Sequence, residues 1–598
     1  MALQLLTKCP RRSGFGTPVT IATRNIRSRN FATIRHFQTT QQYDEEFDVV
    51  VVGSGAGGLT AAITATLVGK QKVLVTEKSK WFGGTSAFSG GALWVPMSRH
   101  TEKDTDSIAR AKTYIQSYLQ KISRMEDYDD ALVSAYLETA PEMVEFLESS
   151  SAAQFVPCAT PDYYMELEGA VTAGRTILNA PYDGRRLGSK LVKQVRYPLQ
   201  GYCAFGSMQA DALDFNAWTH PFSNFRNLAL VTGSVLRYMV DRVRYGKGTN
   251  FCNGNALVGR LLESATRSGI EFRNEAAAIE PILADGRIMG VVIDRHDGPV
   301  RVRAKKAVIL ATGGFARNGS WARKFLPAGS EWTVSPRSNQ GDGIQIGLTS
   351  GGVLPKPLNE NAALWSPVSE IKTRKGPRIY PHFVMGLTKP GSIIVDVDAR
   401  RFANESASYQ DFGKAVQAAG VQKQYLIGTK AHLRKYGMGA ALPAPYPINH
   451  LVRQGYLVRA PTISGLATKI GLDPRKLTAT VEKFNKFARE GKDPDFHRGE
   501  AGYDRAFGDP SQPNPCLGPL EHGPFYAISM HAGNGITMYG LKTNQDAQVL
   551  DSQENPVPGL YAVGADSNHF LRGHYPSGGL TLGPSMVFGY RAGLHSGR

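Results

Sequence analysis

The sequence predicts an α/β fold in which a Rossmann-like dinucleotide-binding domain, built on a parallel sheet, carries an inserted α+β domain. The first observation is the β-branched run Asp48–Val52, which stops at glycines with G-x-G-x-x-G spacing and leads into the helix-compatible segment Leu59–Gly69. The second is that the strand-to-glycine pattern returns at Lys306–Phe315 and Gly559–Asp566, with a segment of different periodicity between them. The 598 residues suffice for two or more cored regions.

The glycine turn after the first strand has the spacing of a dinucleotide site. Gly53 permits a tight turn, Gly55 lets the backbone approach a pyrophosphate, and Gly58 packs the helix closely on the strand. The helix N-terminus, which holds Ala56 and Gly57, then faces the phosphates. A glycine turn with a purely structural purpose is the alternative.

An acidic residue follows the second predicted strand at the expected place. The apolar run Lys72–Thr76 ends at Glu77, about 20 residues beyond Gly58, where a carboxylate accepts hydrogen bonds from ribose hydroxyls. Lys78 comes next and is assigned to the same site. Strand, turn, helix, strand and acid in this order predict a nucleotide site rather than a structural turn.

Changes in composition and periodicity divide the chain into four predicted parts. They are a leader (1–43), the dinucleotide-binding domain (44–335, with a helical insertion at about 100–250), the catalytic or substrate domain (336–520), and a return to the first domain (521–598). Ile270–Ile279 and Ile282–Ile293 are expected to be strands of a second sheet, and Pro474–Glu490 a helix. Asn339–Ile344 is expected to open a helix near the nucleotide.

The formal net charge of +18 is due partly to the leader. Met1–Tyr43 has no Asp or Glu, and its basic residues alternate with Ser and Thr, which is typical of a mitochondrial transit peptide. A disordered basic tail is the alternative. The rest of the chain has no basic run interleaved with aromatic residues, so no nucleic-acid partner is expected. The amphipathic segment Ser234–Tyr245 is expected to pack its apolar face on the core, and contact with a membrane surface is the alternative.

No metal site, disulfide framework or spanning helix is expected. The five cysteines are scattered without a C-x-x-C pair, which fits a reducing or mitochondrial compartment. His531, His569 and His574 have no second ligand at metal spacing. No apolar run reaches about 18 residues without a charge.

A loop of glycines and hydroxyl residues, Trp81–Trp94, suits a flavin diphosphate and the edge of the isoalloxazine. Here the chain resembles the FAD-dependent oxidoreductase 2 (fumarate reductase/succinate dehydrogenase flavoprotein) superfamily, which places a similar loop beside the flavin. Because this loop contains no histidine, the resemblance implies non-covalent FAD. Besides the residues of the glycine turn and Glu77–Lys78, the predicted cofactor-binding residues are Gly84, Thr85, Ser86, Ser89, Gly90, Gly91, Ala277, Ala311, Thr312, Gly313, Gly564, Asp566, Leu580 and Leu582.

Two tyrosines stand where fumarate reductases carry arginines. In those enzymes a run similar to Arg400–Ser408 is followed by the arginine that donates a proton, and this chain has Tyr409 there. The second arginine, just before the paired glycines, is replaced by Tyr575, although Arg572 lies close by. Two phenols in place of two carboxylate-binding arginines favour a neutral carbonyl substrate over a dicarboxylate.

This pattern resembles the 3-oxosteroid 1-dehydrogenase (3-ketosteroid delta-1-dehydrogenase) family from Asp48 to the C-terminus, through the runs PDYY, KPGSIIVD, RRFANESASY and YPSGGLTLGPSMVFGY. The resemblance implies that Tyr575 and the amide of Gly579 polarise the 3-ketone and that Tyr409 is the general base. A further tyrosine, Tyr163 or Tyr164, supports that base, and the sequence does not decide between them.

The expected reaction is FAD-dependent 1,2-dehydrogenation of a 3-oxosteroid or a related polycyclic or triterpenoid 3-ketone, with the C2 proton passing to Tyr409 and a hydride passing from C1 to flavin N5. The alternatives are a 3-oxo-5α-steroid 4-dehydrogenase, a fumarate-reductase-like enzyme, and an electron-transfer or binding flavoprotein subunit. The first is supported by Ser577, two residues after Tyr575. Without C-x-x-C-H or clustered cysteines, the electron acceptor is external: quinone, oxygen or a redox partner.

Overall fold

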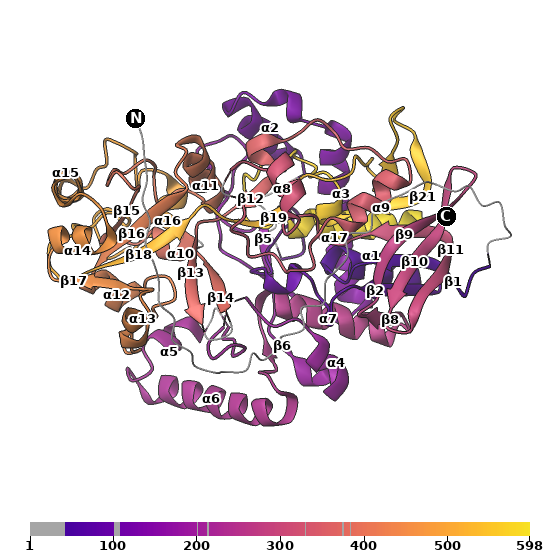
Figure 1. Ribbon diagram of the computed structural model, residues 1–598, viewed down its shortest axis with the longest axis horizontal. Coiled ribbons are helices and arrows are strands. Elements are labelled where there is room, and N and C mark those ends of the chain that lie inside the picture. Colours follow the sequence, from indigo (N-terminus) through magenta and orange to yellow (C-terminus); the bar gives the residue numbers. More distant parts are fainter. Residues whose placement is uncertain are drawn as a thin grey trace, which may run out of the picture. The chain divides into compact units, whose positions relative to one another are not determined.

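The structure is a computed structural model that describes residues 42–597 apart from 101–107, 200, 202, 212–213, 329, 374–375 and 383. The predicted leader, 1–43, lies outside the described residues except for its last two. From residue 43 onward the chain builds two larger sheets with covering helices (Figure 1).

The first sheet is the predicted parallel sheet. Its strand order is β20-β21-β11-β1-β2-β8, and β1 pairs in parallel with both β2 and β11. Val49–Val52 of β1 are buried, as expected for a parallel strand covered on both faces. The α/β fold predicted from the glycine turn is therefore confirmed. The strands are β1 (Glu45–Val52), β2 (Val73–Glu77), β8 (Glu271–Asn274), β11 (Gly298–Leu310), β20 (Gln548–Leu550) and β21 (Pro556–Ala562).

The strands predicted at Ile270–Ile279 and Ile282–Ile293 belong to this first sheet, not to a second one. β8 pairs in parallel with β2, while β9 (Ala277–Ala284) and β10 (Arg287–Arg295) form a hairpin that joins the sheet through β11. Periodicity indicated the strands but not their partners, because pairing depends on contacts distant in sequence.

Helices that are far apart in the sequence cover the first sheet. The helix after the glycine turn, α1 (Ala56–Leu67), packs against the C-terminal helix α17 (Leu582–His595) and against α7 (Asn253–Arg267). A Cβ at Gly589 of α17 would lie 2.3 Å from the carbonyl oxygen of Gly57, so the two helices touch through their backbones. This contact brings the C-terminal segment to the nucleotide turn. Two further helices, α8 (Gly319–Phe325) and α9 (Asp342–Thr349), follow β11.

The insertion between β2 and α7 is mainly helical, as predicted. α3 packs against both α2 and α17, while α6 lies along the lower edge of the molecule as drawn in Figure 1. Its helices are α2 (Ile108–Lys121), α3 (Asp130–Ser150), α4 (Gly188–Gln194), α5 (Phe215–Thr219) and α6 (Phe225–Tyr245). Its short strands are β3 (Leu93–Trp94), β4 (Phe155–Pro157), β5 (Thr176–Asn179), β6 (Tyr182–Asp183) and, just before α7, β7 (Asn250–Phe251).

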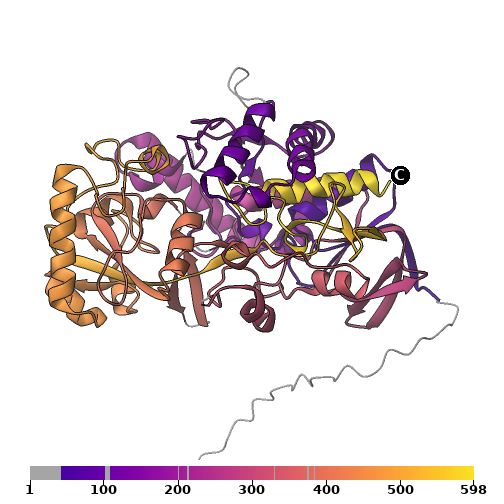
Figure 2. The same cartoon turned by 90° about the horizontal axis from the view of Figure 1, so that it is seen from above.

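The second large sheet has the order β14-β13-β18-β16-β15, with β17 paired to β18 (orange to yellow in Figure 2). Its strands are β13 (Val368–Thr373), β14 (Gly376–Pro381), β15 (Ser392–Val395), β16 (Lys423–Thr429), β17 (Val458–Ala460) and β18 (Phe525–His531). The accompanying helices are α10 (Val384–Leu387), α11 (Tyr409–Ala418), α12 (Lys430–Tyr436), α13 (Asn449–Arg453), α14 (Ile463–Ile470), α15 (Pro474–Glu490) and α16 (Gly502–Ala506). A separate pair, β12 (Ala363–Trp365) and β19 (Asn534–Thr537), flanks this region in the sequence.

Both predicted limits of the second domain, 336 and 520, differ from the limits of this sheet. Helix α9, inside the predicted domain, packs on β9, β11 and β21 of the first sheet. Strand β18 begins after residue 520 yet pairs with β13, β16 and β17. The chain therefore returns to the first domain only after His531.

Helix α15 matches its predicted bounds, Pro474–Glu490, because both ends carry local signals. The Asp473 side chain accepts the amide of Arg475 at the N-terminus, and Gly491 ends the helix in the left-handed conformation. None of the helices in the described part of the chain has the length and apolar character needed to cross a membrane.

Candidate active site

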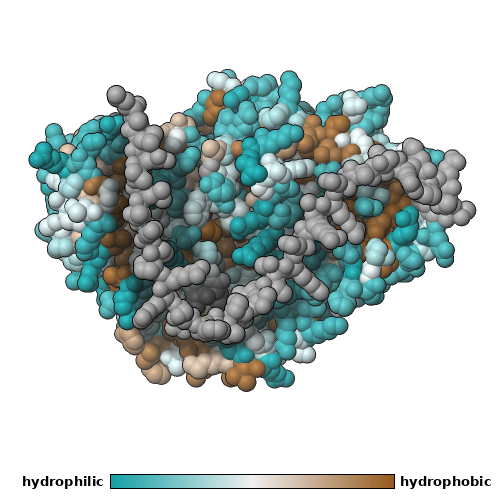
Figure 3. All heavy atoms as spheres, in the orientation of Figure 1, coloured by the Kyte–Doolittle hydropathy of each residue, from teal (hydrophilic) through white to brown (hydrophobic). Residues whose placement is uncertain are grey.

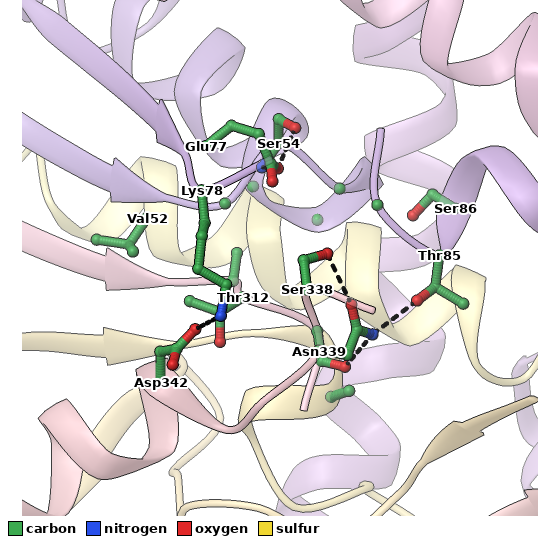
Figure 4. A pocket seen from close by; sticks show the side chains of 18 of the residues that line it. Val52, Ser54, Glu77, Lys78, Thr85, Ser86, Thr312, Ser338, Asn339 and Asp342 are labelled. Atoms are coloured by element: carbon green, nitrogen blue, oxygen red, sulfur yellow. Dashed lines mark hydrogen bonds and ion pairs between the residues drawn. The ribbon is translucent and has the colours of Figure 1, made fainter. Parts of the chain in front are cut away.

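A pocket of about 750 Å³ lies where β1, β2 and β11 end at their carboxyl termini (Figure 4). Ligands of open α/β sheets bind at this edge. The lining comes from six short segments, 52–55 with 57–58, 76–78, 84–86, 276–278, 311–313, and 338–339 with Asp342. Ile536, Val563, Ala565 and Ser585 complete it.

The glycine turn fits a pyrophosphate. A Cβ at Gly53, which has φ +115°, would lie 2.2 Å from the carbonyl oxygen of Ala311, so the end of β11 requires glycine there. At Gly55 a Cβ would meet only Ser86 Oγ, at 3.5 Å, so the absent side chain leaves open space at a pocket-lining position. α1 carries no acidic residue in its first turn, so its N-terminal amides face the pocket without a competing carboxylate.

Glu77 and Lys78 are held in place beside this turn. Glu77 Oε2 accepts the hydroxyl of Ser54 at 2.6 Å, and Oε1 accepts the amide of Ser79 at 2.8 Å. These contacts orient the carboxylate that is predicted to accept the ribose hydroxyls. Lys78 reaches across to Asp342, the first residue of α9, with which it forms an ion pair (Figure 4).

Asn339 ties two walls of the pocket together. Its Nδ2 donates to Thr85 Oγ1 at 2.9 Å and to the carbonyl oxygen of Gly313 at 2.7 Å. Sequence reasoning expected a helix to open here but did not assign Asn339 to the site. It also missed eleven other lining residues: Val52, Ser54, Thr76, Ala276, Ala278, Ser338, Asp342, Ile536, Val563, Ala565 and Ser585.

Several predicted cofactor residues do not line the pocket but contact the segments that do. Asp566 Oδ1 accepts the amide of Gly314 and the Thr312 hydroxyl, both at 2.9 Å, while Oδ2 accepts the Thr312 amide. Burial raises the pKa of Asp566 to about 6. The hydroxyl of Ser89 donates to the carbonyl oxygen of Ser86. The predicted residues that do not line the larger pocket are Ala56, Ser89, Gly90, Gly91, Gly564, Asp566, Leu580 and Leu582.

A smaller pocket, partly open to solvent, extends the first one toward the C-terminal segment. It shares Ile536, Ala565 and Ser585 with the larger pocket, and Gly564 and Thr581 also line it. Because Thr581 follows the run 575–579, the smaller pocket leads from the dinucleotide pocket to the segment that carries Tyr575.

Tyrosines from separate segments of the chain meet next to this segment. Tyr409, the first residue of α11, donates its hydroxyl hydrogen bond to Tyr575 Oη at 3.2 Å, and the amide of Gly579 donates to the same oxygen at 3.0 Å. Tyr163 completes the contact, with its ring centroid 6.0 Å from that of Tyr575 and 6.3 Å from that of Tyr409. The three predicted catalytic positions therefore lie together.

The structure separates Tyr163 from Tyr164, which the sequence did not. Tyr163 belongs to the tyrosine cluster, whereas Tyr164 Oη donates to Asp411 Oδ1 at 2.8 Å and its ring packs on Tyr118. Tyr503, in α16, is a further member that sequence reasoning missed, since its ring centroid lies 4.6 Å from that of Tyr163. No motif surrounds Tyr503 in the sequence. The tyrosine cluster therefore consists of Tyr163, Tyr409, Tyr503 and Tyr575.

Burial decides the protonation of the tyrosine cluster. It raises the pKa of Tyr409 well above its usual value of 10, and the neighbouring phenols Tyr163 and Tyr575 raise it further. Burial also raises the pKa of Tyr575, but the hydrogen bonds that its oxygen accepts from Tyr409 and Gly579 oppose this rise. Both resting phenols are neutral at pH 7, so each can donate a hydrogen bond. To act as a base, Tyr409 must first lose its own proton, which needs a contact that lowers its pKa.

Comparison with known proteins assigns the chain to a family. Residues 48–582 match the FAD binding domain family. The chain belongs to this family. It therefore binds FAD, and the pocket described above has a glycine turn, a helix N-terminus and the carboxylate of Glu77, the features of a dinucleotide site. Non-covalent attachment stays a prediction.

Three relatives illustrate the similarity. A 4-oxocyclohex-2-ene-1-carboxylate 5-dehydrogenase of Sinomonas cyclohexanicum is 36% identical, over 91% of this chain and 93% of that protein. A 3-oxosteroid 1-dehydrogenase of Mycobacterium tuberculosis is 34% identical, over 92% and 98%. The crystal structure of 3-ketosteroid delta1-dehydrogenase from Sterolibacterium denitrificans, in complex with 1,4-androstadiene-3,17-dione, has a TM-score of 0.84 and 32% identity, over 92% and 99%.

A side chain at Gly55 should displace FAD without unfolding the protein. Gly55 has φ −68°, an ordinary backbone conformation, so Gly55→Val introduces no backbone strain and fills the open space at the pocket wall. We expect FAD binding to weaken by about 1–3 kcal/mol, the usual cost of added methyl groups in a packed site. Flavin fluorescence titration of the apoprotein measures it. Gly319→Val, at a surface helix start, is the control, and equal FAD affinity of the two variants would contradict the placement of the pyrophosphate.

A buried ion cluster anchors the loop that presents Tyr409. Glu405 accepts hydrogen bonds from Arg401 at 2.8 and 2.9 Å, from Arg498 at 3.3 Å and from the amide of Ile394 at 3.1 Å. Burial alone would raise the pKa of Glu405, but the two guanidinium groups hold it at about 2. The carboxylate is thus ionised in the folded protein over the whole physiological range.

The free energy of unfolding should therefore decrease at acid pH as Glu405 becomes protonated. Because its folded pKa of about 2 lies below the unfolded value of 4.5, its contribution is present above about pH 4.5 and is lost as the pH falls through about 2. We expect Glu405→Gln to lower the free energy of unfolding by about 3 kcal/mol at pH 7 and by much less near pH 2. Urea denaturation across pH measures this. Glu521→Gln, whose carboxylate pairs with exposed Arg489, is the control. A Glu405→Gln effect that does not change with pH would contradict the assignment.

Proposed function

We propose that the protein is an FAD-dependent 3-oxosteroid 1-dehydrogenase that introduces a double bond between C1 and C2 of a polycyclic 3-ketone. The observation that carries the proposal is the convergence of two hydrogen-bond donors, a phenol and a backbone amide, with a second phenol. Tyr575 Oη and the amide nitrogen of Gly579 lie 3.0 Å apart, and the hydroxyl oxygen of Tyr409 lies 3.2 Å from that of Tyr575.

This geometry suits the acidification of a ring ketone. A carbonyl oxygen that takes the place of Tyr575 Oη as the acceptor of the Gly579 amide would receive hydrogen bonds from both groups, so the charge that develops on it would meet preorganised donors. The C2 protons become acidic. Tyr409 takes one of them as its phenolate, after its own hydroxyl proton has passed to solvent, as C1 loses a hydride. FAD, when bound, supplies the acceptor for that hydride. Because Tyr163 and Tyr503 are buried beside Tyr409, they exclude water from the base.

Charge near the site favours a neutral substrate. Arg572, the arginine closest in sequence to the paired glycines, forms an ion pair with Asp127 at 2.6 Å, and Asp127 also contacts His574 at 2.9 Å. The relatives from M. tuberculosis and S. denitrificans are named for 3-oxosteroids, and the one from Sinomonas for a carboxylated ring ketone. All three names describe dehydrogenation of a cyclic ketone. Because Arg572 is already paired with Asp127, it is not free to bind a substrate carboxylate, which supports the steroid class here. Anaerobic reduction of the flavin by a steroid and by a triterpenoid 3-ketone would show which of the two is the substrate.

The test is anaerobic reduction of the bound flavin. Androst-4-ene-3,17-dione should bleach the flavin and yield a product with a new 1,2-double bond, identified by mass spectrometry and NMR. A 5α-steroid converted only to its 4-ene would point instead to a 4-dehydrogenase, for which the buried Ser577 remains the marker. Reduction by 4-oxocyclohexanecarboxylate or succinate alone would refute the steroid proposal. No bleaching by any ketone would indicate an electron-transfer or binding subunit.

We also propose an external electron acceptor and a mitochondrial location. Reoxidation of the reduced flavin by a quinone, by oxygen or by a partner flavoprotein, compared in stopped flow, identifies the acceptor class. The composition of Met1–Tyr43 supports import. N-terminal sequencing of the mature protein would show cleavage near the end of this segment, and an intact Met1 in a cytosolic fraction would contradict it.

A further inference from the structure

The outer face of α6 carries an apolar stripe that faces solvent. Val243 is 91% exposed, Phe225 85%, Val240 63% and Leu236 57%. Their spacing of three, four, seven and eleven residues places them on one side of a helix with 3.6 residues per turn. The expectation that the apolar face of this helix packs on the core is therefore wrong. We call the set Phe225, Leu236, Met239, Val240 and Val243 the α6 stripe.

The opposite face of α6 holds the helix on the protein. Asp241 is buried and accepts hydrogen bonds from the amide and the hydroxyl of Thr249, at 3.0 and 2.6 Å. Tyr245 is also buried, and the hydroxyl of Tyr238 donates to the carbonyl oxygen of Phe205 at 2.7 Å. Polar groups thus fix the inner face, and the stripe stays available. Figure 3 shows brown surface along the lower edge, where Figure 1 draws α6.

Positive charge borders the α6 stripe on both sides. At 100° per residue, Arg226 and Arg244 fall on one flank of the stripe and Arg242 on the other. All three are exposed. Asp241 is the only acidic residue of the sequence between Asp214 and Glu263, and it is buried. Asp183, the partly exposed acid that contacts α6, is paired with Arg237. A solvent-facing apolar stripe between arginines, with no exposed acid on the helix itself, complements an anionic surface with an apolar interior.

We propose that α6 binds the surface of an anionic lipid bilayer, with its axis parallel to the membrane plane. The aliphatic side chains of the α6 stripe enter the boundary between headgroups and acyl chains, and the flanking arginines contact lipid phosphates. The 21 residues of α6 offer a convex ridge. Phe222, 75% exposed just before α6, extends the apolar contact. The proposal does not depend on which ketone the enzyme oxidises.

Vesicle co-sedimentation of the full-length flavoprotein tests the proposal. The protein should bind vesicles of phosphatidylcholine with phosphatidylglycerol, bind pure phosphatidylcholine more weakly, and dissociate as salt is added. The triple variant Leu236→Ser, Val240→Ser and Val243→Ser should bind the anionic vesicles roughly a hundredfold more weakly, because three inserted aliphatic side chains are lost. Arg226→Gln with Arg244→Gln should cost roughly tenfold.

A matched control separates the stripe from general surface hydrophobicity. Ile279, Val397 and Leu442 are exposed apolar residues on other elements, and their joint replacement by serine should leave vesicle binding unchanged. All variants should keep their flavin and its reduction rate. Equal binding by the stripe variant and the unaltered protein would overturn the proposal, as would absence of binding to anionic vesicles. A concentration-dependent dimer that the stripe variant loses would assign the stripe to a second copy instead.

Discussion

Replacing Tyr409 by phenylalanine should slow anaerobic reduction of the flavin by a 3-oxosteroid by about 10²–10⁴-fold, the usual contribution of a positioned general base. The substitution removes one oxygen atom from a half-buried ring and leaves the FAD pocket intact, since Tyr409 does not line it. Steroid and FAD binding should therefore change little. Stopped-flow absorbance of the flavin under saturating substrate gives the rate constant directly.

The dependence of this rate on pH distinguishes a base from a packing residue. Because burial raises the pKa of Tyr409, the rate for the unaltered enzyme should rise with pH in the alkaline range, and the rate for Tyr409→Phe should not. Tyr164→Phe is the matched control, because it removes a neighbouring hydroxyl that bonds Asp411 outside the tyrosine cluster. A loss below tenfold in Tyr409→Phe, or an unchanged pH profile, would transfer the role of base to another member of the cluster.

The fold was predictable where its determinants are local. The turn at Gly53 follows from a steric requirement of neighbouring strands, and the bounds of α15 follow from Asp473 and Gly491 at its ends. The place of β18 in the second sheet was not predictable, because its partners β13 and β16 lie about 100–160 residues away and pairing leaves no local mark. For this reason β18 lies beyond the predicted limit at 520 although it belongs to the second sheet.

The candidate site shows the same division. Tyr409 and Tyr575 were predicted because Tyr409 ends one recognisable run and Tyr575 begins another, but the distance that makes them a pair is a property of the fold. Tyr163 and Tyr164 are adjacent and chemically identical, and only the direction of their side chains separates them. Tyr503 reaches the tyrosine cluster from α16 with no signal in its surroundings.

The orientation of α6 likewise could not be predicted from the periodicity of its sequence. Apolar residues at helical spacing predict a helix with two faces, and they do not say which face meets the protein. Here buried polar contacts of Asp241 settle the matter, and a single acidic residue in a basic helix gave no hint of it.

Replacing Tyr575 by phenylalanine should slow flavin reduction by about 10²–10³-fold, the usual effect of removing one oxyanion donor. The amide of Gly579 remains and accounts for residual activity. Tyr575→Phe also removes the oxygen to which Tyr409 donates at 3.2 Å. The two substitutions should therefore be non-additive, with the double variant slowed by much less than the product of the single effects, because both phenols act on the same enolising ketone.

Single-turnover rates for the four members of this double-mutant cycle measure the coupling, with Tyr164→Phe in place of Tyr409→Phe as the control cycle. If the effects of Tyr409→Phe and Tyr575→Phe multiply as independent changes, the two phenols do not share a transition state, and the arrangement of donor and base inferred from their contact is wrong. If they couple while Tyr164→Phe and Tyr575→Phe do not, the 3.2 Å contact between the two hydroxyls is part of the catalytic unit rather than of the packing.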